Sequence, residues 1–272
     1  MAFNAIINIY FGIIIILKVR EIKMKIGVST LALYPNPLED ILPFLEDLKV
    51  DYCEIINEYP LNEVQSEIFE SYTIKTTVHS PISDMNLASP NESIRKASIE
   101  QVKKSINLAH KLNANIVVVH PGQVPFLARI FQDKILENNF NSLRECADYT
   151  HEMGIKMCVE NMPDMEGYLF KDINHLNNLV EDLGVFMTLD VGHAHNTGFS
   201  TEEMVKSDRL RHIHLSDNDG SFDNHEALGK GTIDFDNLVE NLNKINYNGV
   251  LTIEVKNREE VLESLRFLKN KI

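Results

Sequence analysis

Nine side chains in this sequence are of the types that bind divalent metal ions. They are His79, His120, Glu160, Asp190, His193, His214, Asp223, His225 and Glu254. Imidazole nitrogens and carboxylate oxygens are ligands that suit zinc and related divalent ions. Bound ions of this kind polarise phosphoryl or carbonyl groups and produce a nucleophilic hydroxide near neutral pH. If the fold brings these side chains together, the sequence predicts a metal centre with hydrolytic or isomerising chemistry.

Six of the nine lie in or at the ends of short apolar runs that are typical of buried strands. The runs are TTVH, IVVVH, MCVE, FMTLD, HIHL and VLTIE. In a barrel of parallel strands, the carboxyl ends of all strands face one common mouth. A polar residue at the end of one strand is ordinary, but six successive strands that end this way indicate a metal site.

Strand-like and helix-like segments alternate along the chain and predict repeated β-α-β units. The expected strands are Lys25–Ser29, Tyr52–Ile56, Lys75–His79, Asn115–His120, Lys156–Glu160, Val185–Asp190, Leu210–Leu215 and Gly249–Val255. Ser93–Leu112 is the clearest amphipathic helix, and Ser200 with Glu203 predicts a capping box. We therefore expect the α/β class and a single (β/α)8 TIM barrel over residues 24–272.

Strand alternation predicts which other side chains face the barrel interior. Thr77, Cys158 and Thr252 share a face with His79, Glu160 and Glu254, respectively. His212 shares a face with His214 one layer deeper, and we expect it to be a hydrogen-bonded interior histidine. The remaining histidines divide into two groups: His195 could contact the ligands from outside, and the solvated ones are His110, His151 and His175.

Composition is that of a globular protein with a large core, at 272 residues and 44% hydrophobic content. The net charge of −14 disfavours a nonspecific polyanion binder. Cys53, Cys146 and Cys158 form no Cys-x-x-Cys pair, which excludes a zinc ribbon and fits a reducing cytoplasm.

Residues 1–23 differ from the rest of the chain. An apolar run at residues 5–17 is shorter than the roughly 20 residues needed to span a bilayer, and no stable membrane span is expected. No basic residue precedes the run, so it is a poor signal peptide. We expect an extension outside the fold, either a mis-assigned start before Met24 or a loosely docked helix. A weak membrane-surface anchor is the alternative.

Taken in order, the motifs around the nine residues resemble the xylose isomerase-like barrel superfamily. The motifs are VHSP, VVHPG, VENMP, LDVGHAH, HIHLSD, FDNHEALGKG and IEV. Their metal ligands are most similar to those of AP endonuclease family 2, the endonuclease IV group. The resemblance implies three zinc ions: one on His79, His120 and Glu160, one on Glu160, Asp190, His214 and Glu254, and one on His193, Asp223 and His225. It predicts a zinc-dependent phosphoester hydrolase.

The DNA-reading parts of those endonucleases have no counterpart here. Their loop with Arg and Trp after the second strand is NEYPLNE in this chain, which contains no Trp. Their Arg between the last Asp and His ligands is Asn224. These departures argue against abasic DNA as a partner and leave another phosphoester as the expected substrate.

Sugar isomerases and epimerases of the same superfamily provide the alternative. They resemble this chain at Glu160, Asp190, His214 and Glu254, which would hold one divalent ion such as Mn²⁺, Co²⁺ or Mg²⁺. Two glutamates then carry protons to and from a small sugar. Glu160 and Glu254 are the expected catalytic residues in either case.

Overall fold

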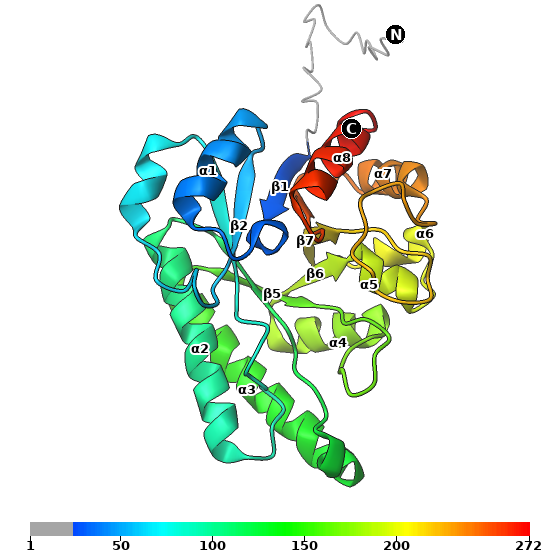
Figure 1. Ribbon diagram of the computed structural model, residues 1–272. Coiled ribbons are helices and arrows are strands. Elements are labelled where there is room, and N and C mark those ends of the chain that lie inside the picture. The colour runs from blue at the N-terminus through cyan, green and yellow to red at the C-terminus, as the bar shows by residue number, and fades with distance from the viewer. Residues whose placement is uncertain (1–23) are drawn as a thin grey trace, which may run out of the picture.

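The protein is a closed barrel of eight parallel strands surrounded by helices (Figure 1). The computed structural model describes residues 24–272. The strands are β1 (Lys25–Ser29), β2 (Tyr52–Ile56), β3 (Lys75–His79), β4 (Ile116–Val119), β5 (Lys156–Glu160), β6 (Phe186–Asp190), β7 (Leu210–Leu215) and β8 (Val250–Ile253). Pairing of β1 with β8, in which Ile26 lies opposite Leu251, closes the ring. The predicted α/β barrel is confirmed; the predicted extension at residues 1–23 lies outside the described residues.

Helices pack against the outer face of the barrel. They are α1 (Leu38–Asp47), α2 (Glu92–Lys111), α3 (Gln132–Met153), α4 (Ile173–Leu183), α5 (Val191–Asn196), α6 (Thr201–Met204), α7 (Phe235–Lys244) and α8 (Arg258–Lys269). Short 3-10 helices occupy three connections: η1 (Thr30–Leu33), η2 (Ser66–Ser71) and η3 (Phe126–Phe131). None of the helices in residues 24–272 is long and apolar enough to cross a membrane.

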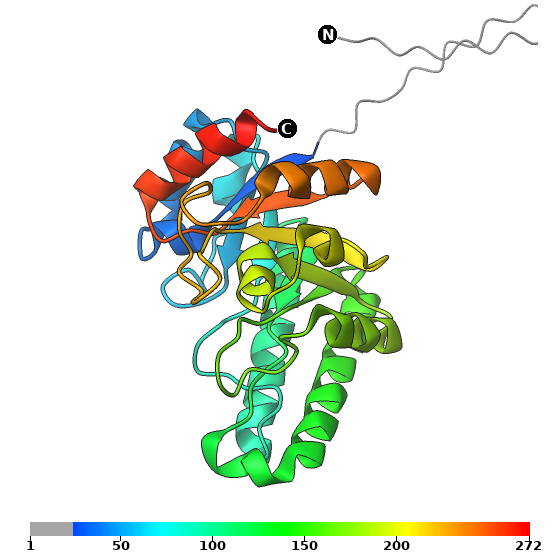
Figure 2. The same ribbon diagram turned by 90° about the vertical axis from the view of Figure 1, so that its right-hand side faces the viewer.

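One repeat departs from the expected pattern, because η2 rather than an α-helix connects β2 to β3. Elsewhere the predicted signals are confirmed. Helix α2 buries Ile99, Val102 and Ile106 on one face, and Ser200 forms the capping box with Glu203. Helices α2 and α3 are long and lie side by side beyond the end of the barrel (Figure 2).

Burial of both faces explains why the strands are apolar runs. All residues of β4 and nearly all of the other strands are buried, as expected where helices cover a parallel sheet. Toward the interior, Thr77 Oγ1 donates to Glu54 at 2.9 Å and Thr252 Oγ1 lies 3.2 Å from His212 Nε2. Cys158 packs with Ile116 and Val118 in a small cluster. The barrel interior therefore combines a buried polar layer, formed by Glu54, Thr77, His212 and Thr252, with apolar packing around Cys158.

The loop between β7 and α7 carries Asp223 and His225 and depends on two glycines. Gly229 has φ +85°, a conformation that L side chains rarely adopt, and its N–H donates to Asp217 Oδ2. A methyl group at Gly231 would overlap the main-chain oxygen of Asn218. The glycines thus let this loop fold back closely over the end of β7.

We predict that Gly231→Ala lowers the free energy of unfolding by about 1–3 kcal/mol, because the loop must move to admit the methyl group. Chemical denaturation of the purified variant measures the loss. Lys230→Ala is the control, since it removes only an exposed ion pair with Glu263 and should change stability by less than about 1 kcal/mol. Equal losses in the two variants would show that close packing at Gly231 does not constrain the loop.

Candidate metal centre and active site

The nine predicted ligands all lie at the carboxyl-end mouth of the barrel. Three of them are the last residues of β3, β5 and β6: His79, Glu160 and Asp190. His120 and Glu254 directly follow β4 and β8, and His214 lies in β7. His193 lies in the first turn of α5, and Asp223 and His225 lie in the β7–α7 loop. The barrel thus brings together residues that are up to 175 positions apart, from His79 to Glu254.

A four-residue group occupies the centre of the mouth. Glu160, Asp190, His214 and Glu254 each offer one ligand atom, and these atoms lie within 4.8 Å of one another. His214 Nδ1 lies 2.8 Å from Glu254 Oε2 and 3.2 Å from Glu160 Oε1, and Asp190 Oδ2 has no hydrogen-bond partner in residues 24–272. Three carboxylates buried this closely repel one another unless a cation lies among them. The group therefore fits a divalent ion.

Two histidine-rich groups lie next to this central group. In one, His79 Nε2 and His120 Nε2 lie 3.1 and 3.3 Å from Glu160 Oε2. In the other, His193 Nε2 and His225 Nε2 lie 3.1 and 2.9 Å from Asp223 Oδ2. Each three-residue group offers ligand atoms within 4.8 Å of one another. The mouth therefore holds three adjacent groups that could each bind an ion.

Main-chain carbonyls orient three of these histidines. His79 Nδ1 lies 2.6 Å from the oxygen of Ser80, His193 Nδ1 lies 2.7 Å from that of Asn161, and His225 Nδ1 lies 3.0 Å from that of Glu254. A carbonyl oxygen only accepts, so each contact places a proton on Nδ1. Each Nε2 then points at a carboxylate in the mouth and can bind an ion when it has no proton.

Charge compensation shifts the acid–base properties of the site. Burial raises the pKa of Asp190 to about 6, and the negative charge of Glu160 contributes to the increase. Burial opposes a charge on His193 and His225, yet Asp190 and Asp223 raise the pKa of His193 to about 9, and Asp223 raises that of His225 to about 10. Without a metal, protons on histidine therefore balance the carboxylates.

Two residues that support the site were not predicted. Asn161 follows Glu160. Its side chain accepts from the main-chain N–H of Asp190 at 2.8 Å and donates to the main-chain oxygen of Asp190 at 3.0 Å. These two hydrogen bonds connect β5 to β6. Glu54 lies in the middle of β2 and is fully buried. The signal for Glu54 was present in the sequence as a carboxylate inside the apolar run YCEII.

The other histidines behave largely as expected. His212 is buried, with Nε2 close to Glu54 and Thr252. His110, His151 and His175 are exposed on helices. His195 lies in α5 near the mouth, but its Nε2 contacts Thr232 Oγ1 at 2.9 Å rather than a predicted ligand. It thus helps to hold the β7–α7 loop.

Comparison with known proteins places this architecture in a family. Residues 26–271 match the family model described as xylose isomerase-like TIM barrel. The chain belongs to the xylose isomerase-like TIM barrel family. The fold-level resemblance inferred from the motifs is thereby confirmed. Family membership leaves the reaction open, because one barrel supports many chemistries through its loops.

Similarity to individual proteins bears on the choice between a hydrolase and an epimerase. An uncharacterized protein of Methanocaldococcus jannaschii is 35% identical over 259 residues, which are 90% of this chain and 88% of its own. A solved D-tagatose 3-epimerase-like protein is 33% identical, with a TM-score of 0.84 over 91% of this chain and 97% of its own. Fructoselysine 3-epimerase of Shigella flexneri is 22% identical over 257 residues, 85% of this chain and 90% of its own.

These similarities contradict the prediction of a zinc-dependent phosphoester hydrolase. Similarity to named epimerases extends over most of both chains, whereas a probable endonuclease 4 of Aquifex aeolicus is 26% identical over 67% of this chain. The hydrolase prediction was wrong because it relied on the nine metal ligands rather than on the loops around them. The loops that lack the DNA-reading residues were the better indicator, and abasic DNA is not supported as a partner.

We predict that the metal-free protein loses stability as the pH rises. A histidine whose pKa is raised on folding stabilises the folded state fully below about pH 6.5, and that stabilisation disappears as the pH passes through the folded value. For His193 and His225 the loss runs from about pH 6.5 up to their folded pKa values of about 9 and about 10. Metal-loaded protein should lose less, because ions replace the protons.

Thermal unfolding of chelator-treated and metal-loaded protein between about pH 6.5 and about pH 10 measures this difference. His225→Asn should reduce the slope in the metal-free protein, and His151→Asn on the exposed face of α3 should not. Parallel curves for the metal-free and metal-loaded forms would show that these histidines do not carry the compensating charge.

Proposed function

We propose that this protein is a divalent-metal-dependent epimerase or isomerase that acts on a ketose sugar or ketose phosphate. The observation that carries the metal-dependent part of the proposal is the convergence of Glu160, Asp190, His214 and Glu254 on one point. Its support is the similarity to a D-tagatose 3-epimerase-like protein at 33% identity over nearly the whole chain. The lining of the mouth, rich in hydrogen-bonding groups, also suits a small polyhydroxylated substrate.

In this proposal, the four residues hold the catalytic ion, which supplies orientation and polarisation of a carbonyl oxygen and an adjacent hydroxyl of the sugar. Three carboxylates and one imidazole suit Mn²⁺ or Co²⁺, whereas the histidine-rich groups around His79 and His225 suit Zn²⁺. The protein would thus bind between one and three ions per chain.

Glu160 and Glu254 carry the protons. In the metal-free protein the positive charge of His214, which contacts both carboxylates, lowers the pKa of each against the effect of burial. In the proposed reaction one glutamate starts ionised and acts as the base, and the other starts protonated. One glutamate accepts the proton from the carbon next to the carbonyl. The other returns a proton to the same carbon from the opposite face, which inverts its configuration. The pair holds one proton before and after the reaction, so the proton count balances.

A small hollow of about 20 Å³, enough for roughly one water molecule, lies beside His120 at the edge of the mouth. It is formed by the loops that follow β3, β4 and β5, and Ile82, Asn86, Gln123 and Tyr168 are among its lining residues. Asn86 is fixed there, since its amide donates to the Gln123 oxygen at 2.8 Å.

Proton exchange tests the proposed reaction directly. Metal-depleted protein is reloaded with Mn²⁺, Co²⁺, Mg²⁺ or Zn²⁺ and incubated in D₂O with ketoses and ketose phosphates. Proton NMR should show deuterium replacing the hydrogen on the carbon next to the carbonyl of at least one substrate, followed by its epimer. If no ketose exchanges with any of the ions, the proposed function is wrong.

We predict that Glu254→Gln lowers kcat by about 10²–10⁴-fold, because an amide cannot accept the proton. Glu160→Gln should do the same while Asp190, His214 and Glu254 retain part of the metal, as counted by elemental analysis. Glu259→Gln, on the exposed side of α8, is the matched control and should keep wild-type kcat. Retention of full turnover in both site variants would exclude these glutamates as proton carriers.

A further inference from the structure

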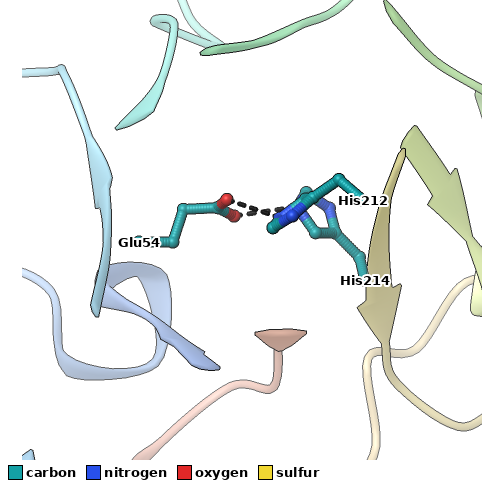
Figure 3. A group of neighbouring side chains, drawn as sticks. All are labelled: Glu54, His212 and His214. Carbon is teal, nitrogen blue, oxygen red and sulfur yellow. Dashed lines mark ion pairs between the residues drawn. The ribbon is translucent and has the colours of Figure 1, made fainter. Parts of the chain in front are cut away.

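A buried carboxylate, Glu54, lies outside the three ligand groups described above and forms a fourth group with His212 and His214, whose ligand atoms also lie within 4.8 Å of one another. Glu54 extends from β2 into the barrel and faces His212 and His214 on β7 (Figure 3). Its Oε1 lies 2.8 Å from His214 Nε2, and its Oε2 lies 2.7 Å from His212 Nε2. All three side chains have no solvent exposure. Strands β2 and β7 are not neighbours in the barrel, so this contact crosses the interior.

The contact decides which nitrogen of His214 faces the mouth. His79, His193 and His225 direct Nδ1 at main-chain oxygens and Nε2 into the mouth. His214 is reversed: Nε2 points down at Glu54, and Nδ1 points up at Glu160 and Glu254. Neither His214 Nε2 nor Glu54 Oε1 has another polar partner within residues 24–272. A carboxylate beside Nε2 favours the proton on that nitrogen and leaves the Nδ1 lone pair for an ion.

Glu54 is itself held in place from two further directions. Thr77 Oγ1 on the adjacent strand β3 donates to Oε2 at 2.9 Å, and His212 lies against the same oxygen. Complete burial of a charged carboxylate is costly unless it is paired in this way. Since the three contacts occupy both oxygens, Glu54 has no oxygen directed into the mouth for an ion or a substrate.

We propose that Glu54 is a positioning residue that sets the proton and ring orientation of His214 and thereby raises the affinity of the four-residue group for its divalent ion. This inference rests on the proposed metal site but not on the reaction carried out there. Outer contacts of this kind contribute about 10–100-fold to metal affinity in other proteins.

The test compares metal affinity in wild type and Glu54→Gln. Calorimetric titration of metal-depleted protein with Mn²⁺ should show a Kd higher by about 10–100-fold in the variant, with the same number of ions bound. Thr77→Val is the matched control: it removes one hydrogen bond to Glu54 but keeps the charge beside His214. Its Kd should stay within a few-fold of wild type, even if its melting temperature falls as far as that of Glu54→Gln.

A measurement on the wild type keeps the inference testable if Glu54→Gln does not fold. In zinc-loaded protein, nitrogen-15 NMR should show His214 with its proton on Nε2 and its Nδ1 unprotonated. A proton on Nδ1 would overturn the inference. So would an unchanged Kd in Glu54→Gln, or the loss of one whole ion, which would make Glu54 a ligand.

The outcomes also separate this inference from the proposed function. Suppose that wild type binds Mn²⁺, that Glu54→Gln binds it more weakly, and that wild type exchanges no ketose proton. The proposed function then fails and the role of Glu54 stands. If wild type exchanges ketose protons and the Kd for Mn²⁺ is the same in both proteins, the proposed function stands and the role of Glu54 is wrong. A wild type that binds no divalent ion contradicts both.

Discussion

The structure depends on keeping several carboxylates close together and away from water. Glu54, Glu160, Asp190 and Glu254 are all buried, and Glu160 and Asp190 belong to the same ligand group. Burial of like charges at this density is unfavourable unless positive charge is interleaved with them. Histidine provides that charge as a proton and gives it up when a metal ion arrives, so that one set of side chains serves both states. The choice of histidine rather than lysine or arginine as the neighbouring base follows from this requirement.

The barrel makes the arrangement possible in two ways: the strands position the ligand side chains, and main-chain carbonyl oxygens orient the imidazole rings. Strands place one polar residue each at a common height, and the carbonyl oxygens immediately beyond β3, β5 and β8 orient the imidazoles of His79, His193 and His225. Such main-chain contacts require no additional side chain. His214 lies within β7, where strand pairing uses the neighbouring carbonyls. Its Nε2, which points away from the mouth, therefore needs a side-chain partner from across the interior. The position of a ligand along its strand thus determines what kind of support it needs.

Much of the fold was predictable because its signals are local. Five of the expected strands agree with the structure to the residue, and the other three differ only at their ends, since β-branched runs bounded by polar residues mark buried parallel strands clearly. The convergence of the ligands followed from their strand-end positions. Glu54 was missed because its meaning is not local: only the contact with β7 shows that a carboxylate inside YCEII is paired. The repeated β-α-β pattern did not predict that the connection between β2 and β3 contains only the 3-10 helix η2.

The reaction was the part least accessible from ligand spacing, and the reason is chemical. A cluster of divalent ions held by imidazole and carboxylate can activate water for attack on phosphorus or acidify a carbon next to a carbonyl, and the ligand set alone does not choose between them. The choice depends on what the surrounding loops admit and on whether a carboxylate is available as a base. Here the loop after β2 lacks Trp and Arg. For this chain, the loops around the mouth therefore bear more directly on the reaction than the metal ligands do.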